Sequence, residues 1–203
     1  EIYNSASMTL EEVIEKMETG VRKGKKIVRL HTGDPSLYGA IREQMDLLDE
    51  KGITYEIIPG VSSFTAACSR IKKEFTLPNV SQTVILTRIE GRTPVPEEEE
   101  LSSLAKHKAS MALFLSVKEI NRVVEKLKEG YGRDDVPVAV IYKATWEDEK
   151  IVLGTLKDIE EKVNNAGITK TAQILVGDFI CGEYERSKLY DPSFSHEYRE
   201  AIK

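Results

Sequence analysis

Strand-length apolar runs alternate with amphipathic helical patterns along almost the whole chain, and this alternation constrains the fold more than any other feature. Such spacing is typical of βαβ units built on parallel or mixed sheets. With 203 residues, the chain has room for two domains of about a hundred residues each. The predicted fold class is therefore α/β, with two α/β domains. The expected strands are 26–31, 54–58, 82–87, 111–115, 138–142, 151–153 and 173–176.

One segment interrupts the alternation and predicts the domain limits. Residues 91–100 contain a glycine, two prolines and four consecutive glutamates. We interpret this segment as a solvated linker that leads into a helix, because acidic side chains suit a helix N-terminus. The predicted domains are 1–90 and 101–203. A helix that starts with the capping box of Thr9 and Glu12 precedes the first expected strand, so we expect the N-terminal domain to be truncated at its start.

Composition and charge exclude several classes of function. Lysine plus arginine number 29 and aspartate plus glutamate 34, so the formal net charge is 29 − 34 = −5. An acidic chain without a basic block is a poor nucleic-acid or anionic-membrane binder. No apolar run approaches the roughly 20 residues of a membrane helix. The two cysteines, Cys68 and Cys181, lie in no CxxC or Cys/His cluster, so we predict a cytoplasmic protein without a disulfide framework or metal site.

The strongest local motif is HTGDPSLYG, residues 31–39, between an expected strand and an expected helix. Ligands of open α/β sheets bind at the carboxyl ends of strands. Gly33 allows a ligand close to the backbone, Asp34 offers an acceptor, and Pro35 fixes the turn. The alternative is an ordinary strand-to-helix turn in which Asp34 is a helix cap. The Lys and Ser/Thr of a phosphate-binding P-loop are absent.

Two further turns carry candidate binding residues. In IPGVSSFTAA, residues 58–67, Ser62 and Ser63 can cap the following helix or contact a ligand. In TRIEGRTPVP, residues 87–96, Arg88 and Arg92 can clamp carboxylates, since guanidinium groups pair well with them. The alternative is that these arginines balance the neighbouring acidic run. The residues alone leave both questions open.

Taken together, these motifs resemble the tetrapyrrole (corrin/porphyrin) methylase family. The resemblance covers nearly the whole chain. Segment 77–96 is similar to the branch that methylates C11 of precorrin-4 or cobalt-precorrin-4 in cobalamin biosynthesis. The motifs that carry the family resemblance are RLHTGDPSLYGAI (29–41), IPGVSSFTAA (58–67), ATWEDEKIVLGTL (144–156) and ILVGDFI (174–180).

The resemblance implies two α/β domains with S-adenosylmethionine bound between them, S-adenosylhomocysteine as product, a tetrapyrrole acceptor and a homodimer. By position, the implied cofactor-binding residues are Thr32, Gly33, Asp34, Leu37, Ser62, Ser63, Leu115, Ala144 and Ala172. The substrate-binding candidates are Arg88 and Arg92. Leu115 stands where relatives often carry Met and Thr171 where they often carry Pro. The initial strand and GxGPGDP loop of the family are absent.

The resemblance also implies a mechanism in which the protein mainly positions two reactants. An electron-rich ring carbon attacks the electrophilic methyl group of a sulfonium, and no catalytic residue is identified for the proton that must leave. Methylation of another ring carbon or of a protein side chain remains an alternative, as does a non-catalytic cofactor-binding fragment. Dehydrogenases and kinases are disfavoured, because GxGxxG and P-loop patterns are absent.

Overall fold

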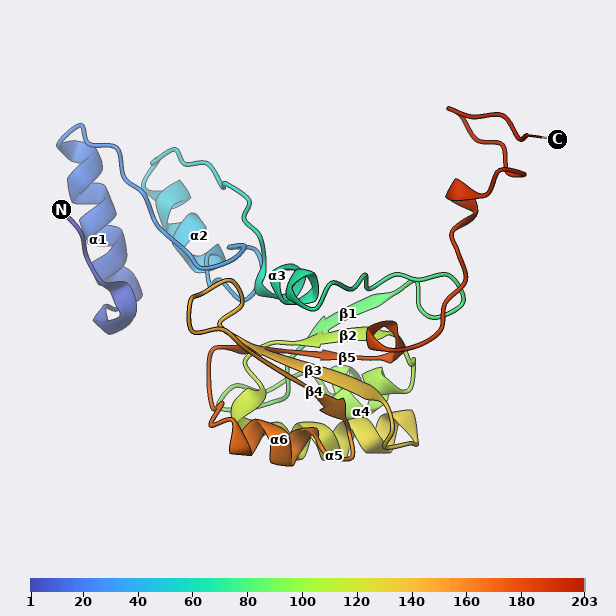
Figure 1. Ribbon diagram of the computed structural model, residues 1–203. Helices are drawn as coiled ribbons and strands as arrows, with labels where there is room; N and C mark the ends of the chain where they lie inside the picture. The colour runs from blue at the N-terminus through green and yellow to red at the C-terminus, as the bar shows by residue number, and fades with distance from the viewer. Residues whose placement is uncertain (203) are drawn as a thin grey trace. The chain divides into compact units, whose positions relative to one another are not determined.

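The computed structural model describes residues 1–202. It divides into two compact units, with the division between Ser63 and Phe64. The second unit is built on a five-stranded mixed sheet of order β1-β2-β5-β3-β4 (Figure 1). Strand β1 runs parallel to β2, whereas β5 is antiparallel to both β2 and β3, and β4 is antiparallel to β3. The strands are β1 (Val84–Thr87), β2 (Ser110–Leu113), β3 (Pro137–Tyr142), β4 (Lys150–Thr155) and β5 (Ala172–Val176).

Helices cover both faces of this sheet and form its core. Helices α4 (Leu101–Ala105), α5 (Ile120–Tyr131) and α6 (Ile159–Asn165) lie against one face (Figure 1). The other face is covered by α3 (Ser63–Arg70), whose Ala67 and Cys68 pack in a cluster with residues of the sheet. Helix α5 buries side chains at helical spacing, and each such apolar side chain contributes about 1.5–3 kcal/mol. These are Ile120, Val123, Val124, Leu127 and Tyr131.

The first unit consists of two helices joined by irregular segments. The capping box is confirmed: Thr9 Oγ1 accepts from Glu12 N–H, and Glu12 Oε2 accepts from Thr9 N–H. Helix α1 (Leu10–Arg22) packs its buried Ile14 and Met17 against Leu48 of α2 (Arg42–Glu50). This small cluster is the apolar core of the unit.

Two of the expected strands are wrong. Segments 26–31 and 54–58 adopt irregular backbone in the structure. Their apolar side chains stay in solvent, with Val28 75% and Leu30 80% exposed. A strand requires a hydrogen-bonded neighbour, and within residues 1–202 neither segment forms one of the named strand pairings. The remaining five expected strands correspond to β1 to β5, each of which has a paired neighbour.

The division into units also differs from the predicted linker at 91–100. Strand β1, expected in the N-terminal domain, pairs with β2 in one sheet, from Val84↔Ser110 to Thr87↔Leu113. The chain therefore passes through 91–100 without leaving the second unit. The acidic run forms a short 3₁₀ helix, η2 (Glu97–Glu99), before α4, which agrees with its expected lead into a helix.

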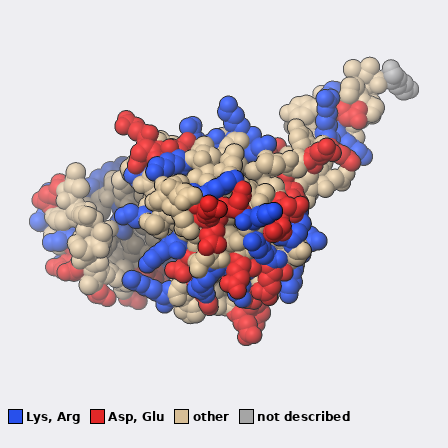
Figure 2. Space-filling view, turned by 60° about the horizontal axis from the view of Figure 1, so that its bottom comes forward, with Lys and Arg blue, Asp and Glu red and all other residues tan. Residues whose placement is uncertain are grey.

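The described residues also contain further short 3₁₀ helices besides η2. They are the 3₁₀ helices η1 (Ser5–Ser7), η3 (Val117–Glu119), η4 (Asp178–Ile180) and η5 (Lys188–Tyr190). Within residues 1–202, no helix combines the length and apolarity needed to cross a membrane. On the face shown in Figure 2, lysine and arginine side chains are interleaved with aspartate and glutamate.

Candidate cofactor and substrate site

In the first unit, two glycine turns make direct backbone contact. Gly33 has φ +69°, a conformation that favours glycine, and a Cβ built on it would lie 3.6 Å from the backbone of Ser62 and Ser63. At Gly60 the approach is closer, because an added Cβ would lie 2.2 Å from the carbonyl oxygen of Gly33. The structure thus brings together the two motifs that the sequence predicted as ligand turns.

The Asp34 carboxylate joins these turns by hydrogen bonds. Its Oδ2 accepts from Gly60 N–H at 3.0 Å, and its Oδ1 accepts from Ser36 N–H at 2.9 Å and from the Ser36 hydroxyl. The Ser36 hydroxyl, followed by the Gly60 amide, lowers the pKa of Asp34 below its usual value. Asp34 therefore closes a local turn with Ser36 and, at the same time, makes a long-range connection to Gly60. It does not cap α2 (Arg42–Glu50), which has Ile41 as its N-cap residue.

The other predicted residues of the first unit surround this contact. Thr32 is exposed, and Leu37 is half-buried with its N–H donated to the Asp34 carbonyl at 3.3 Å. Ser62 is buried, 7% exposed, while Ser63 is exposed and is the first residue of α3. All six predicted residues of this unit thus lie in, or directly beside, the paired turns.

In the second unit, Leu115, Ala144 and Ala172 lie at one edge of the sheet. Leu115 lies two residues after Leu113 of β2. Leu113 pairs with Ile174 of the antiparallel strand β5, and Ile174 lies two residues after Ala172. Ala172 in turn pairs with Tyr142 of β3, which Ala144 follows by two residues. The antiparallel register therefore gathers three positions that are far apart in sequence.

The same edge concentrates strained backbone. Four non-glycine residues here have positive φ: Leu115 (55°), Lys143 (46°), Thr145 (74°) and Thr171 (55°). Each such conformation costs about 1–3 kcal/mol and persists only where the surroundings hold it, often at functional sites. Leu115 also keeps its apolar side chain 77% exposed. This edge of the sheet therefore combines strained backbone with exposed apolar surface.

Two buried polar side chains hold this edge, and the sequence analysis missed both. Ser116 is fully buried. Its hydroxyl donates to Phe114 O at 2.7 Å and accepts from Ile89 N–H at 2.9 Å. Gln173 Nε2 donates to Leu113 O at 2.9 Å. Both residues lie in apolar runs, where an isolated polar residue gives no local signal of its partner.

The turn that begins at Ala144 is held by a third missed residue, Glu149. Its Oε2 accepts from Thr145 N–H at 2.7 Å, and its carboxylate pairs with Arg70 Nε of α3 at 2.8 Å. The Thr145 amide, followed by Arg70, lowers the pKa of Glu149. Glu149 thereby connects helix α3 to the edge that carries Ala144.

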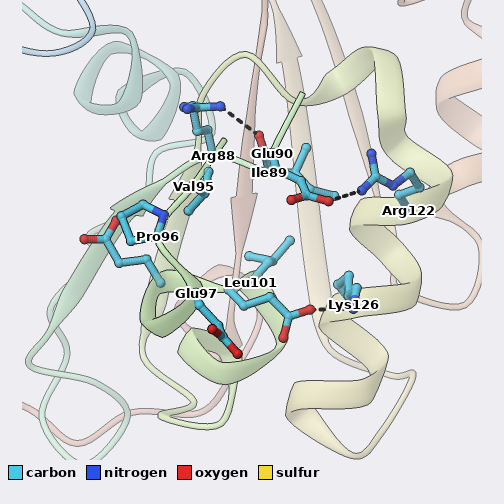
Figure 3. Close-up of a pocket in the computed structure, with 11 residues that line it drawn as sticks. Arg88, Ile89, Glu90, Val95, Pro96, Glu97, Leu101, Arg122 and Lys126 are labelled. Atoms are coloured by element: carbon cyan, nitrogen blue, oxygen red, sulfur yellow. Dashed lines mark hydrogen bonds and ion pairs between the residues drawn. The ribbon is translucent and has the colours of Figure 1, made fainter. Parts of the chain in front are cut away.

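Arg88 lies beside a pocket of about 370 Å³ in the second unit (Figure 3). Its guanidinium donates to Ile89 O at 3.3 Å, Thr93 O at 3.2 Å and Pro94 O at 2.7 Å. Arg92, by contrast, is exposed, and no hydrogen bond or ion pair joins it to another residue within 1–202. The sequence analysis predicted the same carboxylate-binding role for both arginines, but the structure gives them different environments.

Among the described residues, no group of three or more His, Cys, Asp or Glu side chains is arranged to hold a metal ion. Cys68 and Cys181 are free thiols. The fold and the two sets of site residues define an α/β protein with paired glycine turns in one unit and a strained sheet edge in the other.

Residues 1–160 match the family described as Tetrapyrrole (Corrin/Porphyrin) Methylases, and the chain belongs to this family. The cobalt-precorrin-4 C(11)-methyltransferase of Methanocaldococcus jannaschii is 61% identical over 100% of this chain and 79% of its own length. The enzyme of the same name from Priestia megaterium is 49% identical, over 100% and 80%. The precorrin-4 C(11)-methyltransferase of Pseudomonas aeruginosa is 46% identical, over 98% and 80%. The chain thus spans about four fifths of these relatives.

Solved structures agree with the family assignment. The X-ray structure of the cobalamin biosynthetic enzyme cobalt precorrin-4 methyltransferase superposes with a TM-score of 0.87 at 50% identity, covering 89% of this chain and 75% of that one. Uroporphyrin-III C-methyltransferase from Thermus thermophilus, complexed with S-adenosylhomocysteine, gives a TM-score of 0.67 at 18% identity, over 84% and 74%. The second likeness shows the fold alone.

Proposed function

We propose that this chain is an S-adenosylmethionine-dependent C-methyltransferase that acts at C11 of cobalt-precorrin-4 in cobalamin biosynthesis. The observation that carries the proposal is the 61% identity, over the whole chain, to a protein named for that reaction. Among the relatives compared, those named for the cobalt-containing substrate are 61% and 49% identical, and one named for precorrin-4 is 46% identical. This order favours the cobalt form, in which cobalt is part of the substrate.

The site residues fit S-adenosylmethionine as cofactor. At the paired turns, Gly33 and Gly60 leave backbone without side chains, so the polar methionine part of the cofactor can approach peptide groups closely. At the sheet edge, the exposed side chain of Leu115 offers apolar surface for the flat adenine ring. The cofactor-binding residues we propose are those that the sequence predicted.

In the proposed mechanism, the chain positions the two reactants and excludes water. When bound, the cofactor supplies an electrophilic methyl group on a sulfonium. The Asp34 carboxylate fixes the two turns against each other, and Ser116 and Gln173 hold the sheet edge. Orientation of this kind is worth up to about 7–11 kcal/mol of the barrier when the geometry is right. No residue is assigned as the base that removes the ring proton.

The substrate carries several carboxylates, so its binding residues should include free guanidinium groups. The sequence predicted both Arg88 and Arg92 as contacts of this kind, but the Arg88 guanidinium is bound to carbonyls of its own loop, so the proposed contact is the exposed Arg92. On the resemblance, we further propose a cytoplasmic homodimer. The tetrapyrrole is the small-molecule partner in this proposal.

The proposal is tested by calorimetric titration of the chain with S-adenosylhomocysteine, with NAD and ATP as controls. We expect selective binding near micromolar, which corresponds to about −8 kcal/mol. Binding should be followed by methyl transfer to cobalt-precorrin-4 when S-adenosylmethionine is supplied. Equal binding of all three compounds, or binding of none, would contradict the proposed cofactor. Binding without methyl transfer would favour the cofactor-binding fragment.

A further inference from the structure

The guanidinium of Arg88 is committed to its own loop. It donates to three backbone carbonyls, those of Ile89, Thr93 and Pro94, at 3.3, 3.2 and 2.7 Å. A guanidinium has five N–H donors in a rigid planar fork, so it can bind several acceptors at once. The loop consists of residues 89–95. The Arg88 guanidinium connects Ile89 at the start of this loop to Thr93 and Pro94 near its end. The side chain is half-buried in this position.

These hydrogen bonds fix the backbone on both sides of Arg92. The Thr93 carbonyl accepts from Arg88 and also from Gly91 N–H at 3.3 Å, which closes a tight turn with Arg92 at its centre. On the preceding side, Glu90 pairs with Arg122 of α5 at 2.9 Å (Figure 3). The Arg92 side chain is exposed on this turn.

The neighbouring pocket is a poor site for a substrate with many carboxylates. Its lining contains the acidic residues Glu90, Glu97, Glu99 and Glu100 against three cations, Arg88, Arg122 and Lys126. Arg122 and Lys126 are already paired with Glu90 and Glu100. Like charges repel an incoming carboxylate, so this lining disfavours one. Within residues 1–202, Arg92 is the cation of the 89–95 loop that is exposed and joined to no other residue by a hydrogen bond or ion pair.

We infer that Arg88 is a positioning residue, which shapes the 89–95 loop so that Arg92 is presented to a carboxylate of the acceptor. This inference rests on the proposed function, because it takes a polycarboxylate tetrapyrrole as the acceptor. It changes the role of Arg88 from a direct clamp to a residue that acts through Arg92. Arg92 alone contacts the substrate in this arrangement.

A double-mutant cycle on the KM for the tetrapyrrole tests this role. Arg92→Ala should raise that KM about tenfold, and Arg88→Ala by a similar factor. The double variant should be no worse than Arg92→Ala, since the loop geometry matters only through Arg92. In all three, kcat should stay within about twofold and the affinity for S-adenosylhomocysteine should be unchanged. KM increases that multiply would overturn the inference, because Arg88 would then contact the substrate itself.

Arg88→Lys is the second variant, and it keeps the charge. A single ammonium cannot reproduce the three-carbonyl fork, so its KM should rise as in Arg88→Ala. Near wild-type KM for Arg88→Lys would indicate a charge contact with substrate and contradict the inference. Arg42→Ala is the matched control, because Arg42 is an exposed arginine paired with Asp46 on α2.

Hydrogen exchange supplies a readout independent of turnover. Amide exchange at Gly91 should become faster in Arg88→Ala and Arg88→Lys and stay unchanged in Arg92→Ala. Unchanged exchange in both Arg88 variants would overturn the positioning role. Absence of methyl transfer by the wild-type chain would instead refute the proposed function, and the exchange result would still decide whether Arg88 shapes the loop.

Discussion

The carboxylate of Asp34 accepts a hydrogen bond from the backbone N–H of Gly60 at 3.0 Å, across 26 residues of chain. This contact joins two turns that each looked like an independent ligand loop. Gly60 can approach only because it lacks a Cβ, which would lie 2.2 Å from the Gly33 carbonyl oxygen. The paired turns therefore depend on one charge and on one missing side chain.

Replacing Asp34 tests whether the paired turns depend on its charge. Asp34→Ala removes the acceptor of Gly60 N–H and of Ser36, so the two turns should separate and the Kd for S-adenosylhomocysteine should rise about tenfold. Calorimetric titration measures the change. Asp46→Ala, which removes an exposed carboxylate paired with Arg42, is the control. Equal affinities of the two variants would show that Asp34 only closes its local turn with Ser36.

The lowered pKa of Asp34 predicts the direction of the pH dependence. The folded state favours the ionised carboxylate, so its contribution is fully present above the usual pKa and is lost as the pH falls through the lowered value. Cofactor affinity should therefore show no Asp34 titration between about pH 5 and 8. A loss of affinity in that range that disappears in Asp34→Asn would contradict this expectation.

Adding a methyl group tests the close approach. Gly60→Ala should push the turns apart, lower the affinity for S-adenosylhomocysteine at least about tenfold and destabilise the first unit by about 1–3 kcal/mol. Gly52→Ala is the control: Gly52 has φ +64° but no atom near its added Cβ, so it should lose only about 1–2 kcal/mol to backbone strain and keep its cofactor affinity. Wild-type affinity in Gly60→Ala would argue against a functional contact.

Ser116 should matter for stability although it touches no ligand in this account. Ser116→Ala leaves the N–H of Ile89, a 7% exposed residue, without its acceptor. The expected loss is about 1–3 kcal/mol in the free energy of unfolding, measured with urea. Ser69→Ala, at an exposed serine of α3, should lose far less. The account of the sheet edge would be wrong if the two variants unfolded at the same urea concentration.

The two thiols should differ sharply in reactivity. Burial raises the pKa of Cys68 to about 11, and its thiol donates to the Lys73 carbonyl at 3.0 Å. Because the thiolate is the reactive form, Cys68 should stay unmodified by iodoacetamide at about pH 8 in the native protein. Exposed Cys181 should react. Peptide mass spectrometry with and without urea measures both sites, and equal labelling of the native protein would refute the burial argument.

Sequence patterns predicted the sheet of the second unit because its central strands are nearly continuous buried apolar runs. Each of β1 to β5 has a paired neighbour, and the helices between them carry apolar stripes. Segments 26–31 and 54–58 also contain apolar residues typical of strands, yet Val28 and Leu30 are exposed. Local pattern indicates that a segment can pair but not that a neighbour is present, and this limit explains the wrong strands.

Part of the candidate site could also be predicted. Gly33 and Asp34 stand out in the sequence because glycine and aspartate have specific uses in turns. The bond from Asp34 to Gly60 could not be predicted, since it depends on how two distant turns meet. Ser116 gave no signal inside its apolar run. The sequence also did not predict that Arg88 is hydrogen-bonded within its loop while Arg92 is exposed, because this difference arises from the geometry of the loop.

The most direct test of the proposed function is the position of the transferred methyl group. The chain would be incubated with cobalt-precorrin-4 and S-adenosylmethionine labelled with ¹³C in its methyl group, and the product analysed by NMR. The account predicts one labelled methyl group, attached to C11 of the ring. A labelled methyl at another ring carbon, or no labelled tetrapyrrole, would contradict it.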